Sequence, residues 1–137
     1  MPIPMIDNLN YPTPEKIIEY NLLILTLIKV KKADQPKVIN PYAITHAIED
    51  SKHTEGDIYD KAVCLLKGLI QRHPFASGNR RTAFIVVKEF LINNGTPFNV
   101  KDDPADARVM QGIRENYYSN GEIKEWIKHG KIREFKR

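Results

Sequence analysis

Apolar residues recur at helical spacing in the middle of the chain. Between Asp57 and Pro74 they fall three or four positions apart, at Ile58, Ala62, Leu65, Leu66, Leu69 and Ile70. This spacing places them on one face of a helix. Proline lacks the amide hydrogen that a continuing helix needs, so Pro74 ends the segment. The pattern predicts an amphipathic helix that begins near Asp57.

Three further helix starts share one local pattern, in which a capping residue precedes a proline. The pairs are Thr13-Pro14, Asn40-Pro41 and Asp103-Pro104. The capping oxygen accepts a hydrogen bond from an unpaired amide, and proline at the first helical position needs no partner. The pairs predict helices at about 14–31, 41–50 and 104–117.

The segment RRTAFIVVKEFLINN lies between Asn79 and Gly95 and is apolar on nearly every side. A helix of this kind is buried, so we expect it, at about 79–94, to be the central helix. A short last helix, EIKEWIKH, carries Ile123, Trp126 and Ile127 on one face. The fold class is therefore all-α, a compact bundle around the central helix. One small β-hairpin is a further expectation, around 34–39 or 51–57.

Composition changes this picture little. The chain has 137 residues and 42% apolar content, which suits a single domain, 1–137. Its single cysteine, Cys64, cannot form an internal disulfide, and neither a secretory signal nor an apolar segment of membrane-spanning length is present. We expect a cytoplasmic protein without a membrane partner. The net charge of +4 allows a phosphate or an acidic partner, but the lysines are spread out, and we expect no direct nucleic-acid partner.

The stretch HPFASGNRRTAF, residues 73–84, joins two predicted helices. We expect Asn79 to cap the second helix, so that the amides of residues 78–81 point out of a helix N-terminus, which attracts anions. We expect Gly78 to let a phosphate approach the backbone. Arg81 offers a planar fork for phosphate oxygens. Arg80 shares a helical stripe with core positions, and we expect its guanidinium at the inside edge of the domain.

These residue types alone leave two interpretations open. Proline, serine, glycine and asparagine are common in turns for conformational reasons, and paired arginines often form a solvated face. A lone histidine such as His73 is usually structural. Anion binding and an ordinary turn are both compatible with the spacing.

The stretch HPFASGNRR resembles the signature of the Fic/Doc family. That signature has histidine and phenylalanine two apart, then an acidic residue, glycine or alanine, asparagine, glycine or lysine, and arginine. The residues that match it are His73, Phe75, Gly78, Asn79 and Arg81. Similarity extends to DIYDKAVCLLKGLIQRHPF, TAFIVVKEFLINNG and NGEIKEW, about residues 40–128, and the small size favours the Doc branch.

The resemblance implies transfer of part of a nucleotide to a hydroxyl on a protein. His73 would take the proton from the attacking side chain, Asn79 would orient phosphate or base-side groups, and Arg81 would stabilise phosphate charge. Phe75 would anchor the loop in the core. The implied cosubstrate is ATP or another nucleoside triphosphate.

Two positions depart from the signature. Arg80 stands where adenylyl-transferring members have glycine and is closer to the lysine of Doc-type kinases, which favours phosphoryl transfer over adenylyl transfer. Ser77 replaces the acidic ligand of Mg²⁺, and a neutral hydroxyl is a poor ligand for this ion. No metal-ligating residue is therefore assigned. Three alternatives stay open: Arg80 replaces part of the metal's charge, phosphates and water hold the metal, or the enzyme is degenerate.

The resemblance also implies partners. A Doc-like toxin would modify a target protein, such as a translation GTPase, and a small antitoxin protein would hold it in check. The stretch SKHTEG, residues 51–56, matches an autoinhibitory pattern of some Fic proteins through Glu55, at the place where the resemblance puts a substrate-aligning flap. Short patterns of this kind arise readily by coincidence. The remaining alternative to an enzyme is a nucleotide-binding or phosphate-binding module without turnover.

Overall fold

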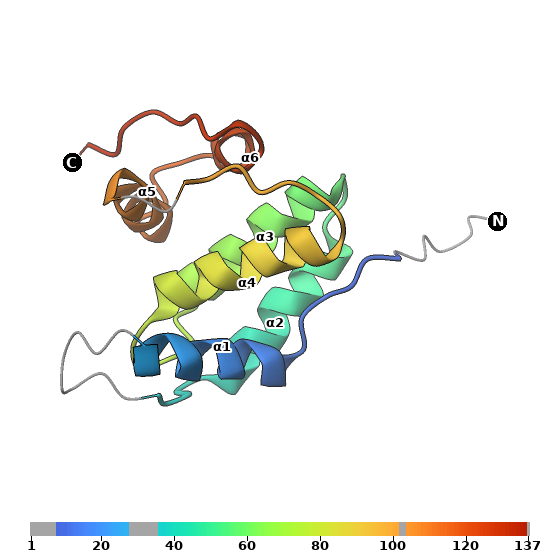
Figure 1. Cartoon of the computed structure of the whole chain (residues 1–137), viewed down its shortest axis with the longest axis vertical. Coiled ribbons are helices and arrows are strands. Elements are labelled where there is room, and N and C mark those ends of the chain that lie inside the picture. Colours follow the sequence, from blue (N-terminus) through green and yellow to red (C-terminus); the bar gives the residue numbers. More distant parts are fainter. Residues whose placement is uncertain (1–7, 28–35, 102–103, 137) are drawn as a thin grey trace.

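A computed structural model describes residues 8–27, 36–101 and 104–136 (Figure 1). These residues form six helices and no extended sheet, which confirms the predicted all-α class. The helices are α1 (Pro14–Leu27), α2 (Pro41–His53), α3 (Ile58–Gln71), α4 (Asn79–Asn93), α5 (Pro104–Arg114) and α6 (Asn120–His129). None of the helices in the described ranges is long and apolar enough to cross a membrane.

The predicted helices are all present, and their ends differ by a few residues. The α2 helix extends to His53, beyond the predicted end near residue 50. The α5 helix ends at Arg114 rather than near 117, because Asn116 adopts a left-handed conformation with φ 57°. The α6 helix begins earlier than EIKEWIKH, since Ser119 accepts a hydrogen bond from the amide of Glu122 and caps it. Residues 28–31 of the first predicted helix lie outside the described ranges.

The expected β-hairpin is wrong for the described residues. Residues 51–53 end α2, and the residues that follow form the cap and turn before α3. In the other expected region, residues 36–39 contribute a single bridge between Val38 and Phe75, while residues 34 and 35 lie outside the described part.

The α3 and α4 helices lie side by side at the centre, with α1 and α2 on one side and α5 and α6 on the other (Figure 1). The α4 helix is central as predicted, and its inner face buries Ala83, Val86, Val87, Phe90 and Leu91.

The α2 and α3 helices approach closely where Gly68 faces Ala47. A Cβ at Gly68 would lie 2.9 Å from the Cβ of Ala47, so glycine is needed for this contact.

One core connects all six helices and includes the C-terminal segment. Phe135 is buried, with its ring 5.0 Å from that of Tyr117. A Cβ at Gly112 of α5 would lie 3.2 Å from Phe135. The tail after α6 therefore packs back onto α5, and the centre of the fold supports the turn between α3 and α4.

Candidate functional site

The turn between α3 and α4, residues 72–78, contains the candidate site. His73 follows the end of α3, is half-buried and has φ 52°, which is uncommon for a residue other than glycine. Phe75 is 1% exposed, which confirms that it anchors the loop in the core. Backbone conformations of this kind persist where surrounding contacts hold them, and they often occur at functional sites.

An extended segment, residues 36–40, holds the turn from one side. The amides of Ile39 and Asn40 donate to the carbonyl of Pro74 at 2.8 and 3.1 Å, and the amide of Ala76 donates to the carbonyl of Lys37 at 2.9 Å. These bonds fix the backbone of the turn on both sides of Phe75. The segment beside the turn is therefore 36–40 and not the 51–56 stretch in which we expected a flap.

Asn79 does not cap α4 as the sequence suggested. Gly78 occupies the N-cap position with φ 78°, and no side chain caps the helix. The Asn79 side chain turns back into the loop instead. Its Oδ1 accepts from the amide of Phe75 at 2.9 Å, and its Nδ2 donates to the Phe75 carbonyl at 2.8 Å and lies 3.1 Å from Nδ1 of His73. In this geometry Asn79 holds His73 and the loop backbone together, and a direct contact with phosphate stays a prediction.

The packing of α1 gives a structural reason for glycine at position 78, in addition to the expected approach of a phosphate. A Cβ at this position would lie 3.1 Å from Cδ2 of Leu25 and 3.2 Å from Nδ2 of Asn21, both in α1. The missing side chain therefore faces α1, and the approach of a phosphate to the Gly78 backbone stays a prediction. Glycine is needed here for the positive φ and for the close contact with α1.

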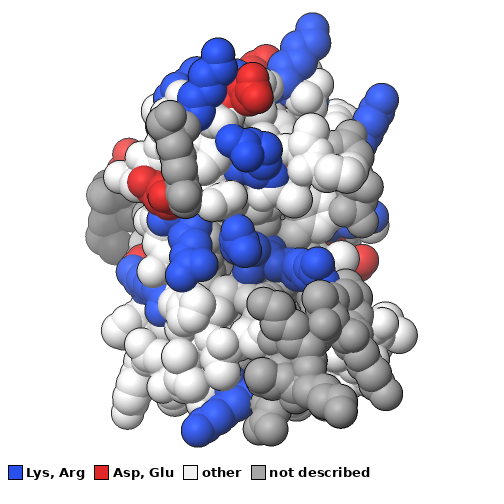
Figure 2. Space-filling model, turned by 90° about the vertical axis from the view of Figure 1, so that its left-hand side faces the viewer, with Lys and Arg blue, Asp and Glu red and all other residues white. Residues whose placement is uncertain are grey.

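Arg80 and Arg81 open α4 and are both exposed, so the expectation that Arg80 leans toward the inside edge is wrong. Its neighbours on the stripe, Val87 and Leu91, are buried, but Phe84, one turn after Arg80, is only half-buried, so this stripe becomes more exposed toward the start of α4. Neither arginine forms an ion pair with a described residue. Figure 2 views the side on which the turn lies, where Lys and Arg predominate over Asp and Glu. The start of α4 thus combines unpaired amides with two available cations.

Ser77 is half-buried, and its carbonyl accepts a hydrogen bond of 2.9 Å from Nδ2 of Asn21 in α1. The same nitrogen donates to Oγ1 of Thr82 at 3.1 Å. The sequence analysis did not single out Asn21. The sequence feature that could have identified Asn21 is its position as a lone polar residue on the buried stripe of α1, between Ile17 and Ile24.

The donors around the turn do not resemble a magnesium site. Ser77 offers a neutral hydroxyl, whereas Mg²⁺ prefers carboxylates together with phosphates and water. Across the described ranges, no three or more His, Cys, Asp or Glu side chains gather in a way that could hold a metal ion. We therefore derive no chemical step through a protein-bound metal.

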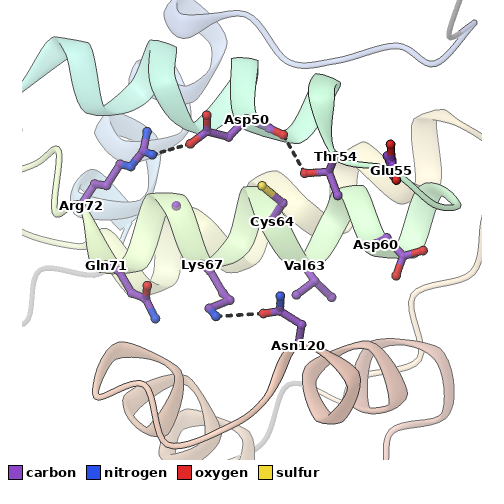
Figure 3. Close-up of a pocket in the computed structure, with 11 residues that line it drawn as sticks. Asp50, Thr54, Glu55, Asp60, Val63, Cys64, Lys67, Gln71, Arg72 and Asn120 are labelled. Carbon is purple, nitrogen blue, oxygen red and sulfur yellow. Dashed lines mark hydrogen bonds and ion pairs between the residues drawn. The ribbon is translucent and has the colours of Figure 1, made fainter. Parts of the chain in front are cut away.

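A groove of about 390 Å³ lies along α3, on the face between α2 and the start of α6 (Figure 3). Most of the residues that line it are polar or charged, and Arg72 pairs with Asp50 at one end while Glu55 and Asp60 lie at the other. The α3 helix separates Glu55 from His73, and a helix of 14 residues is about 20 Å long. Glu55 therefore lies about one helix length from His73, an arrangement that does not favour inhibition of the α3–α4 turn by Glu55.

Comparison with known proteins gives one similarity for the candidate site. No curated protein matches the chain. Residues 28–91, just under half of the chain, match the family model described as the Fic/DOC family, and this stretch includes the whole turn between α3 and α4.

Proposed function

We propose that this chain transfers a phosphoryl group from ATP, or another nucleoside triphosphate, to a hydroxyl side chain of a target protein. The observation that carries the proposal is the α3–α4 turn, in which His73 lies beside a helix start with two available arginines. The turn lies within the stretch that matches the Fic/DOC family. A plain phosphate-binding turn needs no histidine held in a left-handed conformation.

The proposed reaction uses these groups directly. The hydroxyl oxygen of the target attacks the γ-phosphorus, the bond to the β–γ bridging oxygen breaks, and the nucleoside diphosphate leaves with the electron pair of that bond. His73 accepts the hydroxyl proton as the general base and later releases it to water. Arg80, Arg81 and the amides of residues 78–81 stabilise the negative charge on the phosphates. Asn79 keeps His73 in place through their contact of 3.1 Å.

The residue types at positions 80 and 77 bear on two alternatives to this reaction. Adenylyl transfer is the second candidate reaction. The bulky cation of Arg80 argues against it, because adenylyl transfer would need a different orientation of the triphosphate in the site. A nucleotide-binding module without turnover is the third reading. It is favoured by Ser77, which lacks the carboxylate that would hold a metal. The His73–Asn79 contact favours the enzyme.

Transfer of label from ATP to proteins of a cell extract tests the proposal. ATP labelled on the γ-phosphate should mark a protein, and ATP labelled on the α-phosphate should not. Arg80→Gly should shift transfer toward the α-label, and Ser77→Asp should raise the rate and its dependence on magnesium. If the parent binds ATP but neither it nor any variant transfers either label, the binding module replaces the enzyme.

We further propose a toxin role in the cytoplasm, a target such as a translation GTPase, and a small antitoxin partner. The single cysteine, Cys64, is free, which suits a reducing compartment. Expression of the chain should arrest growth, and expression of a small protein encoded beside it should restore growth. Normal growth on expression of a folded, ATP-binding chain would contradict the toxin role without affecting the fold.

A further inference from the structure

Asn21 is a buried polar residue on an otherwise apolar stripe of α1. It is 1% exposed, and its two Nδ2 hydrogens are used by the Ser77 carbonyl at 2.9 Å and by Oγ1 of Thr82 at 3.1 Å. Burying an amide costs free energy unless it forms such bonds, and a leucine would pack here without that requirement. The bond to Thr82 alone would satisfy one hydrogen. The bond to Ser77 instead connects α1 to the candidate site, 56 residues away in the chain.

The Ser77 bond fixes the orientation of one peptide group. No cis peptide is present in the described residues, so the carbonyl of Ser77 and the amide of Gly78 point in opposite directions. Asn21 holds the carbonyl toward α1, and the Gly78 amide therefore points away from α1. This amide has no acceptor among the described residues.

Gly78 by itself does not fix the orientation of this peptide. Gly78 has φ 78° and no side chain, so it tolerates both positive and negative φ. If the peptide rotated by half a turn, a carbonyl oxygen would replace the amide at the start of α4. A carbonyl repels an anion, whereas an amide donates to it.

We propose that Asn21 is a positioning residue that locks the Ser77–Gly78 peptide with its amide turned toward the bound phosphate. This inference rests on the proposed function, because it assumes that the start of α4 receives the phosphates of a nucleotide. Asn21 precedes the stretch that matches the family, residues 28–91, so the match assigns it no role. The α1 helix thereby contributes to the site although it supplies no group that touches the nucleotide.

Two variants separate positioning from stability. Asn21→Leu removes both hydrogen bonds, whereas Thr82→Val removes only the acceptor at Thr82 and preserves the side-chain shape. We expect Asn21→Leu to weaken ATP binding by about tenfold or more in calorimetry, as loss of a hydrogen bond to a charged group does. Thr82→Val should lower the melting temperature but keep ATP affinity within about twofold. Equal weakening by both variants, or none by folded Asn21→Leu, would overturn the inference.

Amide spectra of the parent protein give a second test that needs no variant. The ¹H–¹⁵N signal of Gly78 should shift strongly as ATP is added, and the same should hold in Thr82→Val. In Asn21→Leu this shift should be lost. An unmoved Gly78 signal in a parent that binds ATP would overturn the inference and leave the proposed function standing. A parent that binds no ATP would overturn both.

Discussion

The starts of α3 and α4 differ in how their backbone amides are satisfied. Both helices begin with amides that have no partner within the helix. At α3, the Asp57 side chain accepts from the amides of Tyr59 and Asp60 at 2.9 and 3.1 Å, and the Asp60 carboxylate accepts from the amide of Asp57 at 2.9 Å. At α4, Gly78 has no side chain and caps nothing.

The two helix starts also differ in the charged side chains around them. Lys124 of α6 pairs with the carboxylates of Asp57 and Asp60 at 3.5 and 3.0 Å, so the start of α3 is neutralised within the fold. The start of α4 has the opposite sign, because Arg80 and Arg81 add positive charge where the helix dipole is already positive. That arrangement disfavours folding slightly and favours an external anion. The α3 start therefore serves stability, and the α4 start is suited to binding.

The largest effect that this comparison predicts comes from His73→Ala. We expect it to abolish label transfer and growth arrest while leaving helix content and the melting temperature nearly unchanged, because the side chain is only half-buried. Circular dichroism and the labelling assay measure the two properties on one preparation. Undiminished transfer by the variant would remove His73 as the base, and loss of folding would show that the residue is structural.

Arg81→Ala should reduce ATP affinity by at least about tenfold, since a charge-assisted contact contributes roughly 1.5 to 3 kcal/mol. Arg72→Ala is the matched control. Arg72 is an exposed arginine at the start of the same turn, but it already pairs with Asp50. Calorimetry should show a much smaller loss for the control. Equal losses would indicate a general effect of positive charge and no direct contact by Arg81.

The sequence predicted the order and number of helices because their signals are local. Thr13 accepts a hydrogen bond from the amide of Lys16, and Asn40 accepts one from Ala43, as their pairing with proline indicated. Gly95 and Gly130 follow helices with φ of 70° and 72°, the left-handed conformation that glycine commonly adopts after a helix. These features depend on residues within one turn of each other, so neighbouring sequence suffices.

The details of the candidate site depend on contacts between distant segments, which the sequence does not reveal. Asn79 looked like a cap because asparagine favours that position, yet Gly78 takes it and Asn79 bonds to Phe75. Asn21 reaches Ser77 only because α1 packs against α4. The exposure of Arg80 depends on where α4 leaves the core, which helical periodicity cannot determine.

A change at the other helix start should have the reverse effect. Asp57→Ala removes the cap of α3 and one partner of Lys124, and loss of a capping side chain typically costs about 1 kcal/mol of stability. We expect a lower midpoint in urea and unchanged ATP affinity. Asp57→Asn is the matched control, because asparagine also caps helices and should recover much of the loss. A marked loss of ATP binding in folded Asp57→Ala would contradict the division between the two starts.

The start of α6 extends the comparison to pH and gives the smallest expected effect. Glu122 accepts from the amide of Ser119 and pairs with Arg133 of the C-terminal segment, and the Arg133 hydrogen bond, as the largest cause, lowers the pKa of Glu122 to about 2. A folded-state pKa below that of the unfolded chain, roughly 4.3, means that the pair stabilises the fold above that pH and loses its contribution as the pH falls toward 2. Glu122→Gln should therefore lower stability at neutral pH and flatten its decline in acid, measured as the urea midpoint against pH.

Glu125→Gln is the control, because it removes another carboxylate of α6, which faces His129 instead of Arg133, and it should leave the acid decline intact. Because Glu122 and Arg133 are both partly exposed, water screens their attraction and the change should be smaller than that of Asp57→Ala. If the urea midpoint of Glu122→Gln fell in acid as steeply as that of the parent, the Glu122–Arg133 pair at the start of α6 would not be a source of acid sensitivity.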